Sequence, residues 1–139
     1  MTCLRHYPLT LSAVLVVTIM CLIPIEDPPL KDVRFIDKWT HIVLFGGICA
    51  VCLFEKWNTG RRKSASGATL PDTVSSRGTW LVPIAAALYG GLVELMQAYL
   101  TTCRTGDWLD FAADSVGAVV AYLGYAAIAT LLTRKQIRS

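Results

Sequence analysis

Long apolar stretches alternate along this chain with shorter polar ones, and each apolar stretch is about as long as a membrane is thick. A helix of roughly 20 apolar residues crosses the hydrocarbon core of a bilayer, which is about 30 Å thick. Four stretches reach this length, at residues 7–25, 39–57, 80–100 and 111–132. The pattern predicts an all-α polytopic membrane protein, in which one four-transmembrane-helix bundle forms a single domain over residues 1–139.

The composition agrees with a membrane protein and argues against two soluble classes. Hydrophobic residues make up 54% of the chain and charged residues 17%, whereas ordinary globular chains carry about 25% charge. The net charge of +3 comes from short basic clusters, so no nucleic-acid partner is expected. The five cysteines are odd in number and partly lie in apolar stretches, unlike those of a disulfide scaffold. We expect Cys49 and Cys52 to be packing residues rather than a redox or zinc motif.

Lysine and arginine are unevenly distributed among the segments that flank the spans. With both termini in the cytoplasm, nine of them lie inside and four outside, which is the positive-inside arrangement. Residues 58–79 are rich in Ser, Gly and Thr and are expected to form a flexible cytoplasmic loop. The first span is expected to be retained, because no small-residue cleavage site precedes Glu26.

Ionisable side chains gather near the outer ends of the last three spans. Burying such a group in a bilayer is costly, so an acid within a span indicates a function. Spacings of three and four residues place many of these side chains on one face of their helix. The predicted ligand-binding cluster consists of Asp37, Lys38, His41, Glu94, Gln97, Arg104, Asp107, Asp110 and Asp114.

Small residues continue the polar faces deeper into two spans. Small side chains let helix backbones approach closely in lipid, so these faces are expected to point into the bundle. The small residues are Ala86 and Gly90 on the third span, and Gly117, Ala121 and Gly124 on the fourth.

His41 and Glu94 are the candidate catalytic residues. An imidazole with an ordinary pKa near 6.5 exchanges protons at neutral pH. A histidine that bonds Asp37 or a neighbouring span for structural reasons fits the same pattern. A buried carboxyl suits a general acid or a proton carrier. The structural alternative for Glu94 is an ion pair with Lys38 or Arg104.

The other polar residues also allow two interpretations each. Arg104, with Lys38 beside it, suits a phosphate or carboxylate group of a lipid, because guanidinium binds these groups bidentately. It is equally suited to pair with an acid of the protein. Asp107 and Asp110 could form a catalytic pair, bind a divalent metal or cap the fourth helix. For Asp107 we favour the role of a helix cap. For Asp110 we favour a role in the ligand-binding cluster. No cofactor is expected and no metal is assigned.

The order and spacing of these residues resemble a known family. The motifs are Asp37-Lys38-x-x-His41-x-x-x-Phe45, then Glu94-x-x-Gln97, then Arg104, Asp107, Asp110 and Gly117. Over residues 37–124 they are similar to the VanZ-like family of small bacterial membrane proteins, which often has asparagine where this chain has Asp114. The founding member is associated with low-level resistance to the glycopeptide antibiotic teicoplanin. The resemblance implies a cell-envelope protein of the bacterial inner membrane.

Three functions are compatible with the residues and the resemblance. The first, which the resemblance favours, is to bind an anionic membrane lipid, a cell-wall precursor or a glycopeptide, with a contribution to glycopeptide resistance. The second is an enzyme in which His41 and Glu94 perform acid–base chemistry on a lipid headgroup, although no nucleophile motif is present. A proton-coupled transporter ranks third, because four spans form a thin path and no inverted repeat is visible.

Overall fold

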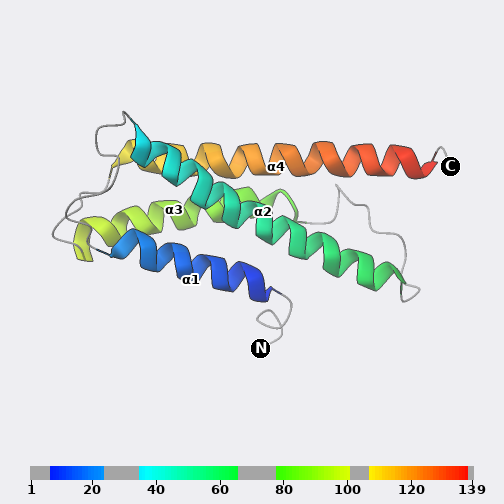
Figure 1. Cartoon of the computed structure of the whole chain (residues 1–139), viewed down its shortest axis with the longest axis horizontal. Coiled ribbons are helices and arrows are strands. Elements are labelled where there is room, and N and C mark those ends of the chain that lie inside the picture. Colours follow the sequence, from blue (N-terminus) through cyan, green and yellow to red (C-terminus); the bar gives the residue numbers. More distant parts are fainter. Residues whose placement is uncertain (1–6, 24–34, 66–77, 101–106, 138–139) are drawn as a thin grey trace.

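Four α-helices run antiparallel to their chain neighbours and form one bundle (Figure 1). The computed structural model describes residues 7–23, 35–65, 78–100 and 107–137. The helices are α1 (Pro8–Leu22), α2 (Ile36–Ala65), α3 (Leu81–Leu100) and α4 (Trp108–Ile137). These ranges contain no strand. The prediction of an all-α, four-helix membrane bundle is therefore confirmed.

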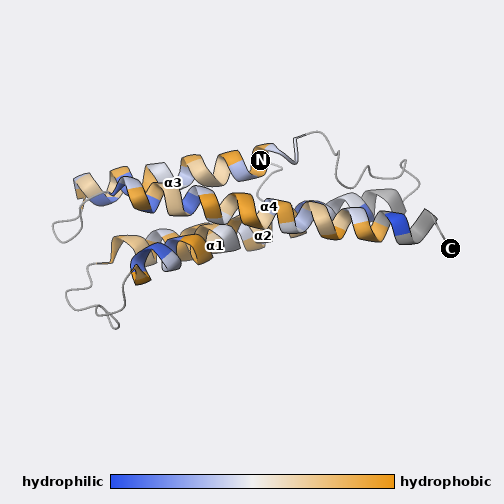
Figure 2. Cartoon of the chain, turned by 90° about the horizontal axis from the view of Figure 1, so that it is seen from above, coloured by the Kyte–Doolittle hydropathy of each residue, from blue (hydrophilic) through white to orange (hydrophobic). Residues whose placement is uncertain are grey.

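Three of the helices contain a segment that is long and apolar enough to cross a membrane. The segments are Ile36–Arg61, Leu81–Leu100 and Trp108–Leu132. Only 28%, 28% and 17% of their most apolar parts are buried inside the bundle, so most of this apolar surface faces outward. Figure 2 shows hydrophobic residues over most of the middle of the helices. An exposed apolar surface of this extent fits contact with lipid acyl chains.

Helix α1 is shorter than the span expected at residues 7–25. Its 15 residues extend about 22 Å at 1.5 Å per residue. Ile23, just after the helix, has a ψ of 124° and is extended. Pro24 follows in the sequence, and a residue before proline avoids the helical region because of a steric clash. The proline therefore explains why the helix ends here.

Helix α2 continues through residues that were expected to form a loop. The prediction of a flexible segment beginning at residue 58 is wrong, because the helix reaches Ala65; residues 66–77 lie outside the described ranges. The Thr59 hydroxyl donates to the Glu55 carbonyl oxygen at 2.9 Å. This bond satisfies the polar side chain without interrupting the helix. Trp57 also packs edge-on against Tyr125, with ring centroids 5.9 Å apart. Contact with α4, which itself continues to Ile137, overrides the loop-like composition.

Helices α2 and α4 cross at glycines. A Cβ atom on Gly117 would overlap the carbonyl oxygen of Ile42, and one on Gly46 would lie 3.0 Å from the carbonyl oxygen of Gly117. The expected close approach is therefore confirmed at Gly117. The same prediction is wrong for Gly124, where a Cβ would meet nothing within 4 Å.

The expected inward face of α3 is confirmed. Ala86 and Gly90 are both buried. Gly90 leaves the space that the Asp114 carboxylate of α4 occupies, because a Cβ at this position would overlap that carboxylate. Ala121 of α4 is partly buried against the core.

One of the two cysteines inside α2 packs as expected. Cys49 is completely buried, and its Sγ donates to the Ala118 carbonyl oxygen at 3.4 Å. Cys52 is half-buried, and both are free thiols. The prediction of a packing residue is confirmed for Cys49.

Polar side chains attach α1 to the bundle at both of its ends. Glu55 accepts hydrogen bonds from the backbone nitrogens of Leu9 and Thr10, both at 2.9 Å, and from the Thr10 hydroxyl at 2.6 Å. It thereby satisfies donors of the first turn, which have no partner within their own helix. At the other end, Gln97 Nε2 donates to the Cys21 carbonyl oxygen at 2.9 Å. These bonds fix α1 against α2 and α3.

A candidate site at the polar end of the bundle

Ionisable side chains of three helices meet at one end of the bundle. Helices α2 and α4 begin there and α3 ends there (Figure 1). The acids in the first turns of α2 and α4 are favourably placed toward the positive end of the helix dipole. We call this group the polar cluster; it consists of Asp37, Lys38, His41, Glu94, Asp107, Asp110 and Asp114.

Lys38 is held by acids of α4 and its N-terminus. Its Nζ lies 2.7 Å from Asp107 Oδ2 and 2.6 Å from Asp110 Oδ1. Asp37 Oδ2 lies farther away, at 3.8 Å. The hydrogen bond from Lys38 lowers the pKa of Asp107 below its ordinary value. The ammonium group is therefore already neutralised within the protein.

Asp107 also caps α4. Its Oδ1 accepts a hydrogen bond from the backbone nitrogen of Leu109 at 2.9 Å, which satisfies a donor of the first helical turn. The preference for capping at Asp107 is confirmed. Asp110 is buried and faces Lys38, so the structure places it in the cluster as expected.

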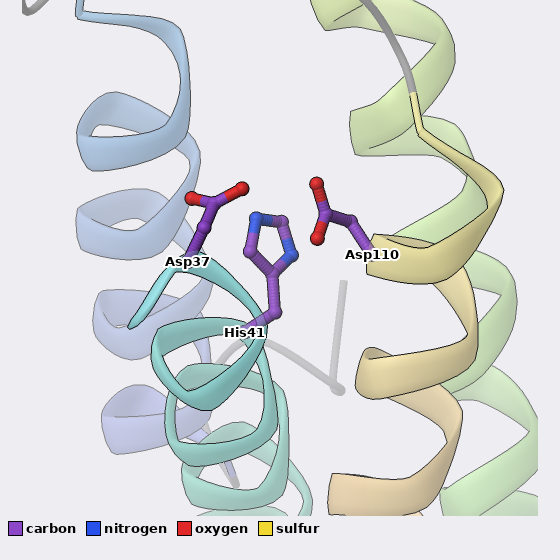
Figure 3. A group of neighbouring side chains, drawn as sticks. All are labelled: Asp37, His41 and Asp110. Atoms are coloured by element: carbon purple, nitrogen blue, oxygen red, sulfur yellow. The ribbon is translucent and has the colours of Figure 1, made fainter. Parts of the chain in front are cut away.

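His41 is bonded across the bundle to α4. Its Nδ1 lies 2.9 Å from Asp114 Oδ1, and Asp114 is completely buried. One turn further along α2, Phe45 stacks on the imidazole with an interplanar angle of 9°. Figure 3 shows the imidazole between the carboxylates of Asp37 and Asp110. The ring is thus held by the stacked Phe45 and by the contact at Nδ1, as a histidine oriented for chemistry or coordination requires.

Glu94 joins α3 to the start of α4. Its Oε2 accepts a hydrogen bond from the backbone nitrogen of Asp107 at 2.9 Å, and its Oε1 lies 3.7 Å from His41 Nδ1. Within the described ranges its ion-pair partner is therefore His41, not Lys38. Arg104, the other expected partner, lies outside those ranges.

Two buried carboxylate oxygens lack a hydrogen bond. In the described part of the chain, neither Glu94 Oε1 nor Asp114 Oδ2 has a hydrogen-bond partner. Asp110 Oδ1 also lacks an ideally oriented donor, but the ammonium of Lys38 lies 2.6 Å away. The polar cluster contains five carboxylates against one lysine and one histidine. Among these residues negative charge is in excess.

The structure does not bring all the predicted site residues together. Gln97 is on the same face of α3 as Glu94, but its Nε2 bonds to the end of α1. Arg104 belongs to the segment that is not described. Conversely, Phe45 was not predicted as a site residue, although it packs on the imidazole. Its spacing of four residues from His41 was the available signal.

No family model, curated protein or solved structure matches the chain. The capabilities of the polar cluster follow from its own side chains. These are proton exchange at the imidazole and carboxyl groups, hydrogen bonding, and the binding of a cation.

Proposed function

We propose that this chain is a VanZ-like membrane protein of the bacterial cell envelope, which binds a ligand at the polar cluster on the outer side of the inner membrane. One observation carries the proposal, namely that the cluster extends from an exposed carboxylate to buried ionisable groups. The side chain of Asp37 is 49% exposed, whereas those of His41 and Glu94 are 3% and 9% exposed. Ionisable groups kept at such a depth in a membrane protein usually serve function.

The charges of the cluster favour one part of the expected ligand range. An anionic lipid headgroup would have to compete with Asp107 and Asp110 for Lys38, whose Nζ they hold at 2.7 and 2.6 Å. The excess of carboxylates instead suits ammonium and hydroxyl groups, which donate hydrogen bonds to them. Peptide and sugar portions of a cell-wall precursor or a glycopeptide carry such groups. We therefore place these ligands before the anionic lipid and propose a contribution to glycopeptide resistance.

Expression in a susceptible bacterium tests this function. Cultures carrying empty vector, the unmodified chain, Glu94→Gln or Glu55→Gln are compared for teicoplanin susceptibility and for whole-lipid composition by mass spectrometry. Glu55→Gln is the matched control, because it changes a buried carboxylate of the same bundle outside the polar cluster. We expect the unmodified chain and Glu55→Gln to make the cells less susceptible to teicoplanin than the empty vector does. Cells with Glu94→Gln should be as susceptible as those with the empty vector, and the lipid composition should be the same in all four cultures. Equal susceptibility in all four cultures at matched expression would contradict the proposal.

A membrane-embedded enzyme is the second candidate, and the hydrogen bond between His41 and Asp114 favours it. A base oriented by a carboxylate is the usual arrangement for activating a hydroxyl group. The chain itself offers no such nucleophile among the described residues near the cluster, because the Ser115 hydroxyl donates to the Phe111 carbonyl oxygen at 2.9 Å. An enzyme at this site would therefore use a water molecule. A lipid species that changes with the unmodified chain but not with Glu94→Gln would favour this function over binding.

A further inference from the structure

We infer that His41, Glu94 and Asp114 form a binding site for one divalent transition-metal cation, such as Zn²⁺. The three residues come from α2, α3 and α4 and are all buried. We call them the metal triad. This inference does not depend on the proposed ligand, because it rests only on the positions and charges of the three side chains.

The donor atoms of the metal triad are spaced as the ligands of one ion are. Each residue offers one donor, and the three donors lie within 4.8 Å of one another. His41 Nδ1 is 2.9 Å from Asp114 Oδ1 and 3.7 Å from Glu94 Oε1. Zinc binds nitrogen and oxygen at about 2.0–2.2 Å in a tetrahedral arrangement, which places adjacent donors about 3.3–3.6 Å apart. The two spacings from His41 are therefore close to those that one ion requires.

The charge of the metal triad also calls for a cation. Glu94 Oε1 and Asp114 Oδ2 are buried and, within the described ranges, accept no hydrogen bond. With the imidazole in the neutral form that a metal ligand requires, the two carboxylates give the triad two negative charges, which a divalent ion balances. The nearby lysine, Lys38, is already paired with Asp107 and Asp110. Leaving ionised carboxylates in an apolar bundle without a counter-charge is strongly unfavourable.

Neighbouring groups hold the donors of the metal triad in place. The backbone nitrogen of Asp107 donates to Glu94 Oε2 at 2.9 Å, which leaves Oε1 toward the ion. Phe45 stacks on the imidazole. Such supporting contacts are typical of metal sites and tune their affinity.

A second group of possible donors lies at the exposed end of the polar cluster. Asp37 and Asp110 flank the imidazole (Figure 3) and, with His41, form a second group whose donors lie within 4.8 Å of one another. Asp37 is exposed and Asp110 is buried. This second group would offer carboxylate oxygens to an ion that approaches from the exposed end, before it reaches the metal triad.

Metal titration of the full chain in lipid nanodiscs tests the inference. The protein is stripped with a chelator and titrated with Zn²⁺, and with Co²⁺ as an optical probe of the ligand geometry. We expect one ion per chain, a Co²⁺ absorption spectrum that Zn²⁺ displaces, and a higher unfolding temperature with Zn²⁺, because binding to the folded state stabilises it. Glu94→Gln should weaken Zn²⁺ binding at least about tenfold.

Two further variants keep the test decisive. Glu55→Gln changes a carboxylate about 21 Å away from His41 along α2 and should bind Zn²⁺ like the unmodified chain. Asp114→Asn should weaken binding as Glu94→Gln does, and circular dichroism verifies that each variant is helical. The inference is overturned if the unmodified chain binds no Zn²⁺, in which case protons neutralise the triad. It is also overturned if folded Glu94→Gln and Asp114→Asn bind as tightly as Glu55→Gln.

Discussion

Glu55 and Glu94 are both buried glutamates in apolar helices, yet their surroundings give them different roles. Both oxygens of Glu55 accept hydrogen bonds, from the first turn of α1. Glu94 uses one oxygen to bind the start of α4 and leaves Oε1 without a hydrogen bond in the described structure. A fully satisfied carboxylate stabilises a fold, whereas an unsatisfied one costs free energy and suggests that a ligand or proton completes it. We therefore propose only Glu94 as a site residue.

Glu55→Ala should loosen the start of α1. The change removes three partly buried hydrogen bonds, and leaving such donors unsatisfied costs up to about 1–3 kcal/mol. We expect the free energy of unfolding to fall by this amount, measured by denaturant titration in detergent micelles. Glu55→Gln, which retains an oxygen acceptor, should lose less. A stability equal to that of the unmodified chain would show that α1 does not depend on these bonds.

At the scale of the elements, glycines decide how closely α2 and α4 approach. The backbone of α4 at Gly117 touches the Ile42 carbonyl oxygen closely enough to leave no space for a methyl group. The same contact brings the imidazole of His41 within 2.9 Å of Asp114, because His41 directly precedes Ile42 and Asp114 lies about one turn before Gly117. Helix packing and site geometry are therefore coupled.

Gly117→Ala should separate α2 from α4. Forcing an extra methyl group into a tightly packed contact costs about 1–3 kcal/mol, and we expect a corresponding loss of unfolding free energy together with weaker Zn²⁺ binding. Gly124→Ala is the matched control on the same helix, because a Cβ there meets nothing within 4 Å. It should leave stability unchanged or raise it by up to about 1 kcal/mol through higher helix propensity. Equal stability of the two variants would contradict the proposed role of the crossing.

At the scale of the whole molecule, the antiparallel order brings one end of every helix to the same end of the bundle, while α2 and α4 extend beyond α1 and α3 at the other end (Figure 1). Helices α2, α3 and α4 each contain a segment suited to crossing the membrane. With 15 residues, α1 falls short of the usual length, although it lies alongside α2 and α3, to which Glu55 and Gln97 attach it. Whether the chain crosses the membrane three or four times therefore depends on whether α1 crosses it.

Both termini should lie on the cytoplasmic side. We expect this because α1 is fastened to the bundle at both ends and so crosses with it, through locally thinned lipid. Cysteine accessibility or reporter fusions at each terminus measure the outcome, with a reporter in the segment 24–34 as the opposite-side control. Termini on opposite sides would show that only α2, α3 and α4 cross.

How far the sequence alone determines this protein depends on the range of the interactions involved. Apolar length and helical spacing predicted the four helices, the inward face of Glu94 and the capping of Asp107, because these features follow from contacts within one segment or from its burial in lipid. The chain alone did not reveal that α2 passes residue 58, that Gly124 is free of contact, that Gln97 turns to α1 or that Lys38 is held by two acids. Each depends on which neighbour a face meets, and helix register and crossing are set by packing between distant segments. The pairing of His41 with Asp114, residues separated by 73 positions, was decided by the tertiary structure for that reason.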